Sequence, residues 1–215
     1  MQTHHSTLHA IQRIDFAPDT FTPGDLLWLP HHAELARTGK KRQTEHLAGR
    51  IAAVHALRAF GEKSVPGIGK NRQPIWPDGI YGSISHCDDT AIAIVARTPV
   101  GIDIEAVFSP QLADELASHI ASEEELAVLR ASALPFPLAL TLAFSAKESA
   151  FKAYSTQTNG QPGFHSAQVV ALDACTIRLR FTARFVPALA NSVISINGLI
   201  NGPHVITCTL PLNEA

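Results

Sequence analysis

The sequence predicts an α+β protein, because its helical and extended segments gather in separate parts of the chain and do not alternate strictly. Three stretches have apolar residues at helical spacing: residues 40–60, 123–131 and 137–155. The last third of the chain holds four short β-type runs separated by Asp, Asn, Gly and Pro. Such a succession is typical of an antiparallel meander. We place a joint at ARTPVG, residues 96–101, and expect an N-terminal half of residues 1–98 and a C-terminal half of residues 99–215.

Each predicted helix carries its own start or stop signal. In residues 40–60 the apolar positions are followed by Gly61, a common helix terminator. Ser122 precedes residues 123–131 as an N-cap, and Glu125 stands three residues later as its capping-box partner. Pro137 suits the first turn of the third helix.

The strand signals lie outside these helices. TAIAIVA (90–96) is rich in β-branched residues, and VGIDIEAV (100–107) alternates between apolar and other residues. YGSISHC (81–87) is a short strand-like segment. The predicted meander consists of AQVVAL, TIRLRF, SVISIN and HVITCTL.

Composition excludes several functional classes. The chain has 215 residues and a formal net charge of −2, so no global field favours nucleic acid or anionic membrane. Its three cysteines, Cys87, Cys175 and Cys208, lack the C-x-x-C spacing of a zinc or redox site and fit a reducing compartment. No signal-peptide core and no membrane-length apolar run is present, so we expect a cytoplasmic protein.

Two carboxylates share one face of the strand VGIDIE. Because side chains alternate along a strand, Asp103 and Glu105 point the same way as Gly101. Neighbouring carboxylates repel each other, and a hard cation such as Mg²⁺ removes that repulsion. The other interpretation is the solvent-facing side of a half-buried strand. Gly101 favours close approach of a ligand or of another backbone.

The stretch LAFSAKESAFKAY, residues 142–154, places charges in an apolar helix. Glu148 and Lys152 stand four residues apart, the spacing of an ordinary surface pair. However, the residues around them are mostly Ala and Phe, which indicates a buried helix, and buried charges need partners or a metal. Both interpretations stay open at this point.

Phosphate-binding candidates come from the first half. Ser83, Ser85 and His86 offer hydroxyls and an imidazole, although an ordinary strand-to-turn boundary explains them equally. Arginine suits bidentate phosphate contact, and each arginine can also be a solvated surface charge. The arginines concerned are Arg42, Arg50 and Arg72.

Taken together, these fragments resemble the signature of the 4′-phosphopantetheinyl transferase superfamily. VGIDIE is followed about forty residues later by FSAKESAFK, and GSISH and KRQTEHLAGRIAA match two further elements. Within the superfamily the chain is most similar to the enterobactin synthase component D branch. The resemblance covers residues 26–155 roughly and implies two similar α+β halves. Each half would have a small, three-stranded antiparallel sheet packed on a long helix, with the active site in a cleft between the halves.

The resemblance also implies a reaction and a metal site. The enzyme would move 4′-phosphopantetheine from coenzyme A to a serine of an apo carrier domain. Asp103, Glu105 and Glu148 would hold Mg²⁺, or Mn²⁺, which neutralises charge building on the pyrophosphate. Glu148, directly or through a metal-bound water, would take the serine proton. Lys152 would contact the coenzyme A phosphates and stabilise the leaving group, with Lys147 as a weaker assistant.

In the N-terminal half, the resemblance assigns contact with phosphate, at the 3′-position of coenzyme A, to five side chains: Ser85, His86, Arg42, Arg50 and Arg72. In some relatives a carboxylate matching Glu125 sits near the metal, and here its capping-box interpretation competes with that role.

The implied partners are apo aryl or peptidyl carrier domains of a nonribosomal peptide synthetase, in enterobactin-type siderophore synthesis. We expect a monomer that binds no nucleic acid, with any membrane association peripheral or through the synthetase. Two alternatives are another Mg²⁺-dependent enzyme that cleaves phosphoanhydrides, such as a nucleotide hydrolase, and a non-catalytic carrier-binding protein.

Overall fold

The computed structural model describes residues 1–158 and 162–211, and the chain divides into two compact units. Unit 1 is Met1–Val100 and unit 2 is Gly101–Leu212. None of the helices in the described residues combines the length and the apolar character needed to cross a bilayer. The roles predicted for the two halves remain predictions.

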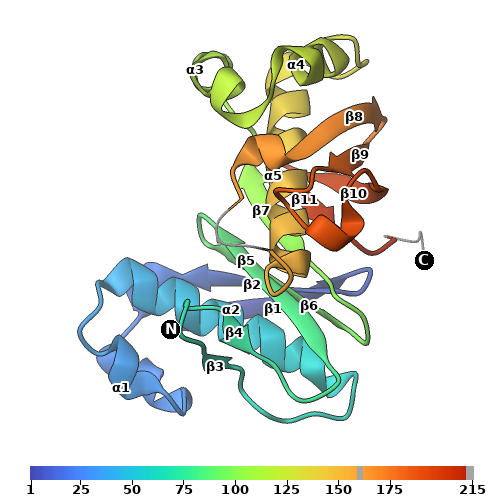
Figure 1. The fold of residues 1–215 in the computed structure, drawn as a ribbon. Helices are drawn as coiled ribbons and strands as arrows, with labels where there is room; N and C mark the ends of the chain where they lie inside the picture. Colours follow the sequence, from blue (N-terminus) through green and yellow to red (C-terminus); the bar gives the residue numbers. More distant parts are fainter. Residues whose placement is uncertain (159–161, 212–215) are drawn as a thin grey trace. The chain divides into compact units, whose positions relative to one another are not determined.

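Unit 1 is built on a four-stranded antiparallel sheet with the order β1-β2-β6-β5, and the long helix α2 packs against it (Figure 1). A short helix, α1, precedes α2, and a two-stranded ribbon, β3-β4, follows it. The elements are β1 Gln2–Leu8, β2 Ile11–Ala17, α1 His32–Leu35, α2 Lys40–Arg58, β3 Gly67–Ile68, β4 Pro74–Ile75, β5 Tyr81–Cys87 and β6 Thr90–Ala96.

Small residues let α2 lie close to its sheet. Ala48, Ala52 and Ala53 are fully buried against Ile14 and the alanines of β6. A Cβ atom on Gly49 would lie only 2.8 Å from Cγ2 of Ile84 on β5. The α2 face of β5 is therefore the face that carries Ile84 and, by alternation, His86.

Unit 2 contains a five-stranded antiparallel sheet with the order β7-β11-β10-β9-β8. Helix α5 packs along β7 and β11, and α3 and α4 pack on α5 (Figure 1). The elements are β7 Ile102–Ala106, α3 Pro110–Ile120, α4 Glu123–Arg130, α5 Phe136–Tyr154, β8 Ala167–Asp173, β9 Thr176–Phe181, β10 Val193–Asn201 and β11 His204–Cys208.

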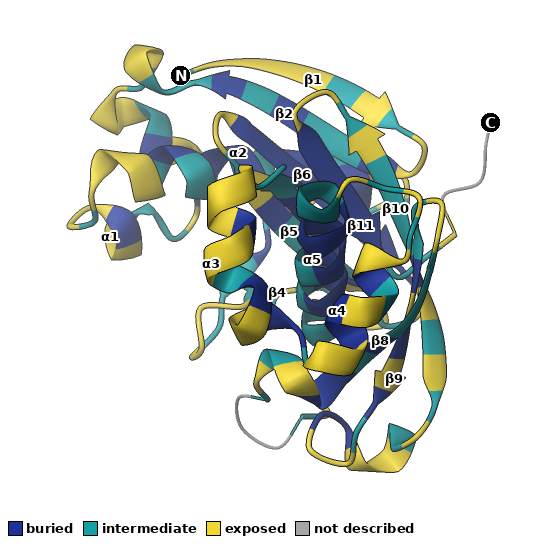
Figure 2. Cartoon of the chain, turned by 90° about the horizontal axis from the view of Figure 1, so that it is seen from above, coloured by how far each residue is buried: buried dark blue, intermediate teal, exposed yellow. Residues whose placement is uncertain are grey.

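Helix α5 is the buried centre of unit 2, drawn mostly in dark blue in Figure 2, whereas α3 and α4 expose their outer faces. It runs antiparallel to β7: the Phe108 amide donates to Thr141 Oγ1, and Gly101 lies against the backbone of Ser149. A Cβ atom on Gly101 would lie 1.8 Å from the Ser149 carbonyl oxygen. The sequence indicated that Gly101 allows close approach of either a ligand or another backbone. The structure shows the approach of another backbone, that of α5.

The structure confirms the α+β class, and it places the three predicted helices within two residues of their predicted ends. The four C-terminal strands form the predicted meander. The expectation of three-stranded sheets was wrong, because the hairpin β1-β2 adds to the first sheet and the meander itself has four strands. The sequence analysis also missed α3.

Candidate functional site

Asp103 lies on β7 facing α5 and is held there by Lys152. The Lys152 ammonium donates to Asp103 Oδ1 at 2.6 Å and to the Ile102 carbonyl oxygen at 3.1 Å. The Asp103 side chain is 3% exposed, so the interpretation of its strand face as a solvent face is wrong for this residue. The contact joins β7 to the last turn of α5 and brings together two residues that are 49 positions apart.

Glu148 lies one helical turn before Lys152 and shares its electrostatic surroundings. Burial raises the pKa of the Glu148 carboxyl, Lys152 lowers it, and Asp103 raises it further. Two carboxylates and one ammonium therefore act on one another at this point of unit 2. Because the Lys152 ammonium bonds to Asp103, the simple surface-pair interpretation of Glu148 and Lys152 is insufficient.

Glu105 follows Asp103 on the same face of β7 and is half-buried. Its register partner on β11 is Val205, and this pair lies two residues along the strands from the pair Asp103–Thr207. Asp103 and Glu105 therefore share one face of β7, as predicted. The role of Glu105 as a metal ligand remains a prediction.

The donor set fits a divalent metal ion. Mg²⁺ and Mn²⁺ prefer carboxylate oxygens. Asp103 and Glu148 supply such oxygens from two rigid elements, and their mutual repulsion is the kind that a cation removes. The residues that would hold the ion are Asp103 and Glu148, with Glu105 on the same strand face.

Lys147 and Glu125 form a separate buried ion pair in unit 2. Lys147 Nζ donates to Glu125 Oε1 at 2.6 Å and to the Ile120 carbonyl oxygen at 2.7 Å, and both side chains are at most 3% exposed. Burial lowers the pKa of Lys147, and Glu125 acts in the opposite direction. The Lys147 ammonium is thus engaged within unit 2, and the predicted contact of Lys147 with coenzyme A phosphates remains a prediction.

Glu125 joins three elements at one carboxylate. Oε2 accepts from the Ser122 amide at 2.9 Å, and Ser122 Oγ accepts from the Glu125 amide, which completes the predicted capping box of α4. Oε1 accepts from the Val169 amide of β8 at 2.7 Å as well as from Lys147 on α5. The capping-box alternative for Glu125 is therefore confirmed.

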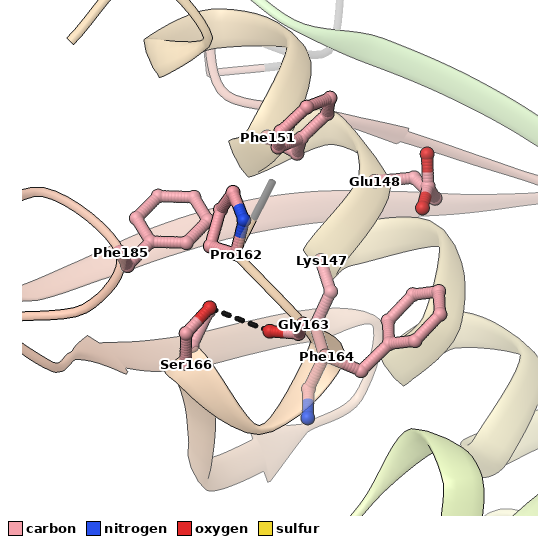
Figure 3. Close-up of a pocket in the computed structure, with 9 residues that line it drawn as sticks. Lys147, Glu148, Phe151, Pro162, Gly163, Phe164, Ser166 and Phe185 are labelled. Atoms are coloured by element: carbon pink, nitrogen blue, oxygen red, sulfur yellow. Dashed lines mark hydrogen bonds between the residues drawn. The ribbon is translucent and has the colours of Figure 1, made fainter. Parts of the chain in front are cut away.

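A cavity of about 220 Å³ opens beside Glu148 (Figure 3). Lys147 and Glu148 leave α5 in different directions, and aromatic rings line much of the space. Its lining residues are Lys147, Glu148, Phe151, Pro162, Gly163, Phe164, Ser166, Ala167 and Phe185. The sequence analysis missed the contribution of residues 162–185, because no local pattern connects them with α5.

In unit 1, a cationic cluster lies along one side of α2. Arg42, His46 and Arg50 follow one another at steps of four residues, which places them on one side of the helix. His31 Nε2 lies 2.9 Å from His46 Nε2, so one imidazole donates to the other. Burial lowers the pKa of His46 to about 3, and Arg50, His31, Arg42 and His86 add to the effect. The mutual repulsion of these groups makes this a favourable place for an anion.

Arg50 is buried and holds the β3 segment. Its Nε donates to the Pro66 carbonyl oxygen at 2.8 Å and its Nη2 to the Gly67 carbonyl oxygen at 3.0 Å. Burial lowers the pKa of Arg50 to about 10, with Arg42 contributing. Arg72 is exposed, at a positive φ of 65° in the turn between β3 and β4. Arg50 therefore supports the ribbon whose turn carries Arg72.

Ser85 and His86 point to opposite faces of β5. His86 lies on the α2 face, with Nδ1 3.8 Å from Glu45 Oε1. Ser85 is buried on the other face, as the uninterrupted register of β5 with β6 requires. His86 joins the α2 cluster and Ser85 does not, so one phosphate group contacting both side chains from the α2 face is not supported.

Two family models match nearly the whole chain. The 4′-phosphopantetheinyl transferase N-terminal domain matches residues 31–96, and the 4′-phosphopantetheinyl transferase superfamily matches residues 99–209. The chain belongs to the 4′-phosphopantetheinyl transferase superfamily. It is a transferase that uses coenzyme A as its substrate, and the family requires a divalent metal ion. The family prediction and the enzyme class are thus confirmed.

Individual phosphopantetheinyl transferases agree with this assignment. Enterobactin synthase component D of Salmonella typhi is 50% identical over 211 residues, which cover 96% of this chain and 90% of that protein. The Escherichia coli K12 protein of the same name is 54% identical over 175 residues, covering 80% of this chain and 84% of that protein. The transferase PptT of Mycobacterium tuberculosis is 34% identical over 197 residues, covering 86% of this chain and 80% of that protein.

Proposed function

We propose that this transferase loads 4′-phosphopantetheine onto aryl or peptidyl carrier domains of an enterobactin-type siderophore synthetase. The support for the siderophore pathway is the 50–54% identity to proteins named enterobactin synthase component D. The observation that carries the chemistry is the group formed by buried Asp103 and half-buried Glu148 and Lys152.

In this proposal the metal ion is Mg²⁺, held by Asp103 and Glu148 with Glu105 as a third ligand. When bound, it neutralises charge on the pyrophosphate of coenzyme A. Lys152 reaches the same carboxylates, since its ammonium lies 2.6 Å from Asp103 Oδ1. A phosphate group approaching Asp103 would meet this ammonium, which supports leaving-group stabilisation by Lys152.

We assign proton removal from the carrier serine to Glu148. Its carboxyl group borders the cavity of unit 2. The cavity beside it is bordered by Phe151, Phe164 and Phe185, which favours an uncharged chain over a second phosphate group. We therefore place the pantetheine arm there, so that the group being transferred lies next to the proposed base.

The α2 cluster of unit 1 is a proposed contact for a phosphate group of coenzyme A. Arg42 and His86 are exposed and can reach a ligand, whereas Arg50 already donates to two carbonyl groups. We propose Arg42, His86 and the exposed Arg72 as direct contacts, and Arg50 as the support of the loop.

The test is mass spectrometry of an apo carrier domain incubated with the protein, coenzyme A and Mg²⁺. The wild type should add one phosphopantetheine group to the carrier, and Asp103→Asn and Glu148→Gln should each lose this transfer while remaining folded. The matched controls Asp114→Asn and Glu123→Gln change exposed carboxylates on α3 and α4 and should transfer normally. Near-normal transfer by either site variant would remove that residue from the proposed metal site.

A further inference from the structure

Three hydroxyl groups are enclosed between α5 and β11. Ser145, Ser149 and Thr207 are completely buried. Thr207 Oγ1 lies 2.9 Å from Ser145 Oγ and 2.8 Å from Ser149 Oγ, and Ser149 Oγ donates to the Thr207 carbonyl oxygen at 2.9 Å. Since each hydroxyl has one proton, Thr207 donates to Ser149 and Ser145 donates to Thr207. Every proton in this hydroxyl chain is therefore used.

The hydroxyl chain lies next to the carboxylates of the candidate metal site. Thr207 is the register partner of Asp103 across β11 and β7, so their side chains leave the same face of the sheet. On α5, Ser145 stands three residues before Glu148 and Ser149 stands directly after it. Thr207 thus contacts the helix on both sides of Glu148 and is paired with the strand position of Asp103.

These contacts restrict two movements of α5 relative to the sheet: sliding along the strand and rotation of the helix. Ser145 and Ser149 are one helical turn apart, so bonding both to one threonine resists sliding of the helix along the strand. Because the hydroxyls are buried, any rotation that separates them leaves unpaired polar groups away from water, which is unfavourable. The relative position of Glu148 and Asp103 depends on both movements.

We propose that Thr207 is a positioning residue for metal binding: its hydroxyl sets the register of α5 against β7 and β11, and so holds Glu148 at coordinating distance from Asp103. This inference rests on the metal site of the proposed function. Groups that orient metal ligands commonly change metal affinity about 10- to 100-fold when they are removed. A residue that served packing alone would change stability and leave metal affinity unaltered.

The test measures Mn²⁺ binding to the full-length protein by electron paramagnetic resonance, with and without coenzyme A. Thr207→Val, which replaces the hydroxyl with a methyl group, should weaken Mn²⁺ binding about 10- to 100-fold. Thr207→Ser keeps the hydroxyl and should bind Mn²⁺ like the wild type. Ser149→Ala removes one hydroxyl of the hydroxyl chain without adding a methyl group. It should show the same loss of Mn²⁺ affinity, and it replaces Thr207→Val in the test if that variant does not fold.

The matched control is Thr44→Val, on α2 of unit 1. Thr44 is buried and donates to the Lys41 carbonyl oxygen within its own helix, so this bond does not link α5 to the sheet of unit 2. It should lower stability in urea unfolding without changing Mn²⁺ affinity. Unchanged Mn²⁺ affinity in Thr207→Val and Ser149→Ala would overturn the positioning role and leave the proposed metal site standing. Failure of the wild type to bind Mn²⁺ would overturn both.

Discussion

At the residue scale, Glu148 shows how a carboxylate proposed to bind metal weakens the fold that holds it. Its side chain is half-buried on α5, and the Asp103 charge adds to desolvation in raising its pKa. The folded protein therefore binds the Glu148 proton more tightly than the unfolded chain does. Without metal, this stabilises the fold below the unfolded pKa near 4.5, and the benefit is lost as the pH rises through the raised folded pKa.

We expect Glu148→Gln to raise the melting temperature of the metal-free protein at pH 7.5, because glutamine stays neutral where the buried carboxylate is charged. The difference from the wild type should narrow as the pH falls and should disappear below pH 4.5, where the glutamate is protonated in both states. Scanning fluorimetry in a chelator measures both effects. Saturating Mg²⁺ should stabilise only the wild type.

A control for this prediction is Glu123→Gln, an exposed change on α4. It should leave the melting temperature unchanged across the same pH range. A Glu148→Gln protein that melts below the wild type at pH 7.5 would contradict the burial of an unfavourable charge at this position.

Single residues also show where prediction from sequence ends. The local sequence indicated that Glu148 carries charge in apolar surroundings, and the structure agrees. It did not predict that Lys147 bonds to Glu125, because the two residues are 22 positions apart and no local rule connects them. His46 was missed for a related reason: its importance comes from His31 and the flanking arginines, and an isolated histidine carries no such signal.

At the element scale, the ion pair Lys147–Glu125 ties α5 to α4 and β8. Lys147→Met alone leaves the Glu125 carboxylate buried without its cation, and it should destabilise the protein by about 3–5 kcal/mol. Adding Glu125→Gln removes the unpaired charge and keeps one carbonyl oxygen, which can accept from either the Ser122 amide or the Val169 amide. The double variant should therefore lose less unfolding free energy than the two single variants lose in sum. Urea unfolding of the four proteins gives the coupling energy, and simple additivity would contradict a paired role.

Gly101 sets how closely α5 approaches β7. Gly101→Ala places a Cβ atom 1.8 Å from the Ser149 carbonyl oxygen, and the backbone must move to relieve the overlap. We expect a loss of about 3 kcal/mol or more in urea unfolding, at the upper end of overpacking effects. Gly163→Ala is the matched control, since a Cβ there meets nothing within 4 Å. Equal stability of the two variants would contradict the close helix–strand approach.

Elements with strong periodic patterns could be predicted from sequence, and weakly patterned ones could not. The helices at α2, α4 and α5 and the C-terminal strands all have clear spacing or caps. β1 was missed because its sequence, QTHHSTL, is polar and mostly exposed at the edge of its sheet. α3 was missed although Ser109 and Pro110 give it a proper start, with Ser109 Oγ accepting from the Leu112 amide.

At the scale of the whole molecule, both units carry family sequence: the family models match residues 31–96 and 99–209. We expect cleavage of coenzyme A to depend on the carrier, because the transferred group needs the carrier serine as its acceptor. Chromatography should detect adenosine 3′,5′-bisphosphate only when an apo carrier is present. A carrier with its acceptor serine changed to alanine is the control. Release of the bisphosphate at a similar rate without carrier would support the hydrolase alternative.

The central claim is that Asp103 and Glu148 together hold the divalent metal ion that the transfer requires. The most direct measurement is a crystal structure of the protein with coenzyme A and Mn²⁺, in which anomalous scattering locates the ion. We predict an anomalous peak within coordinating distance of both carboxylates. A peak that neither carboxylate contacts, with Asp103 still bonded to Lys152, would contradict this claim.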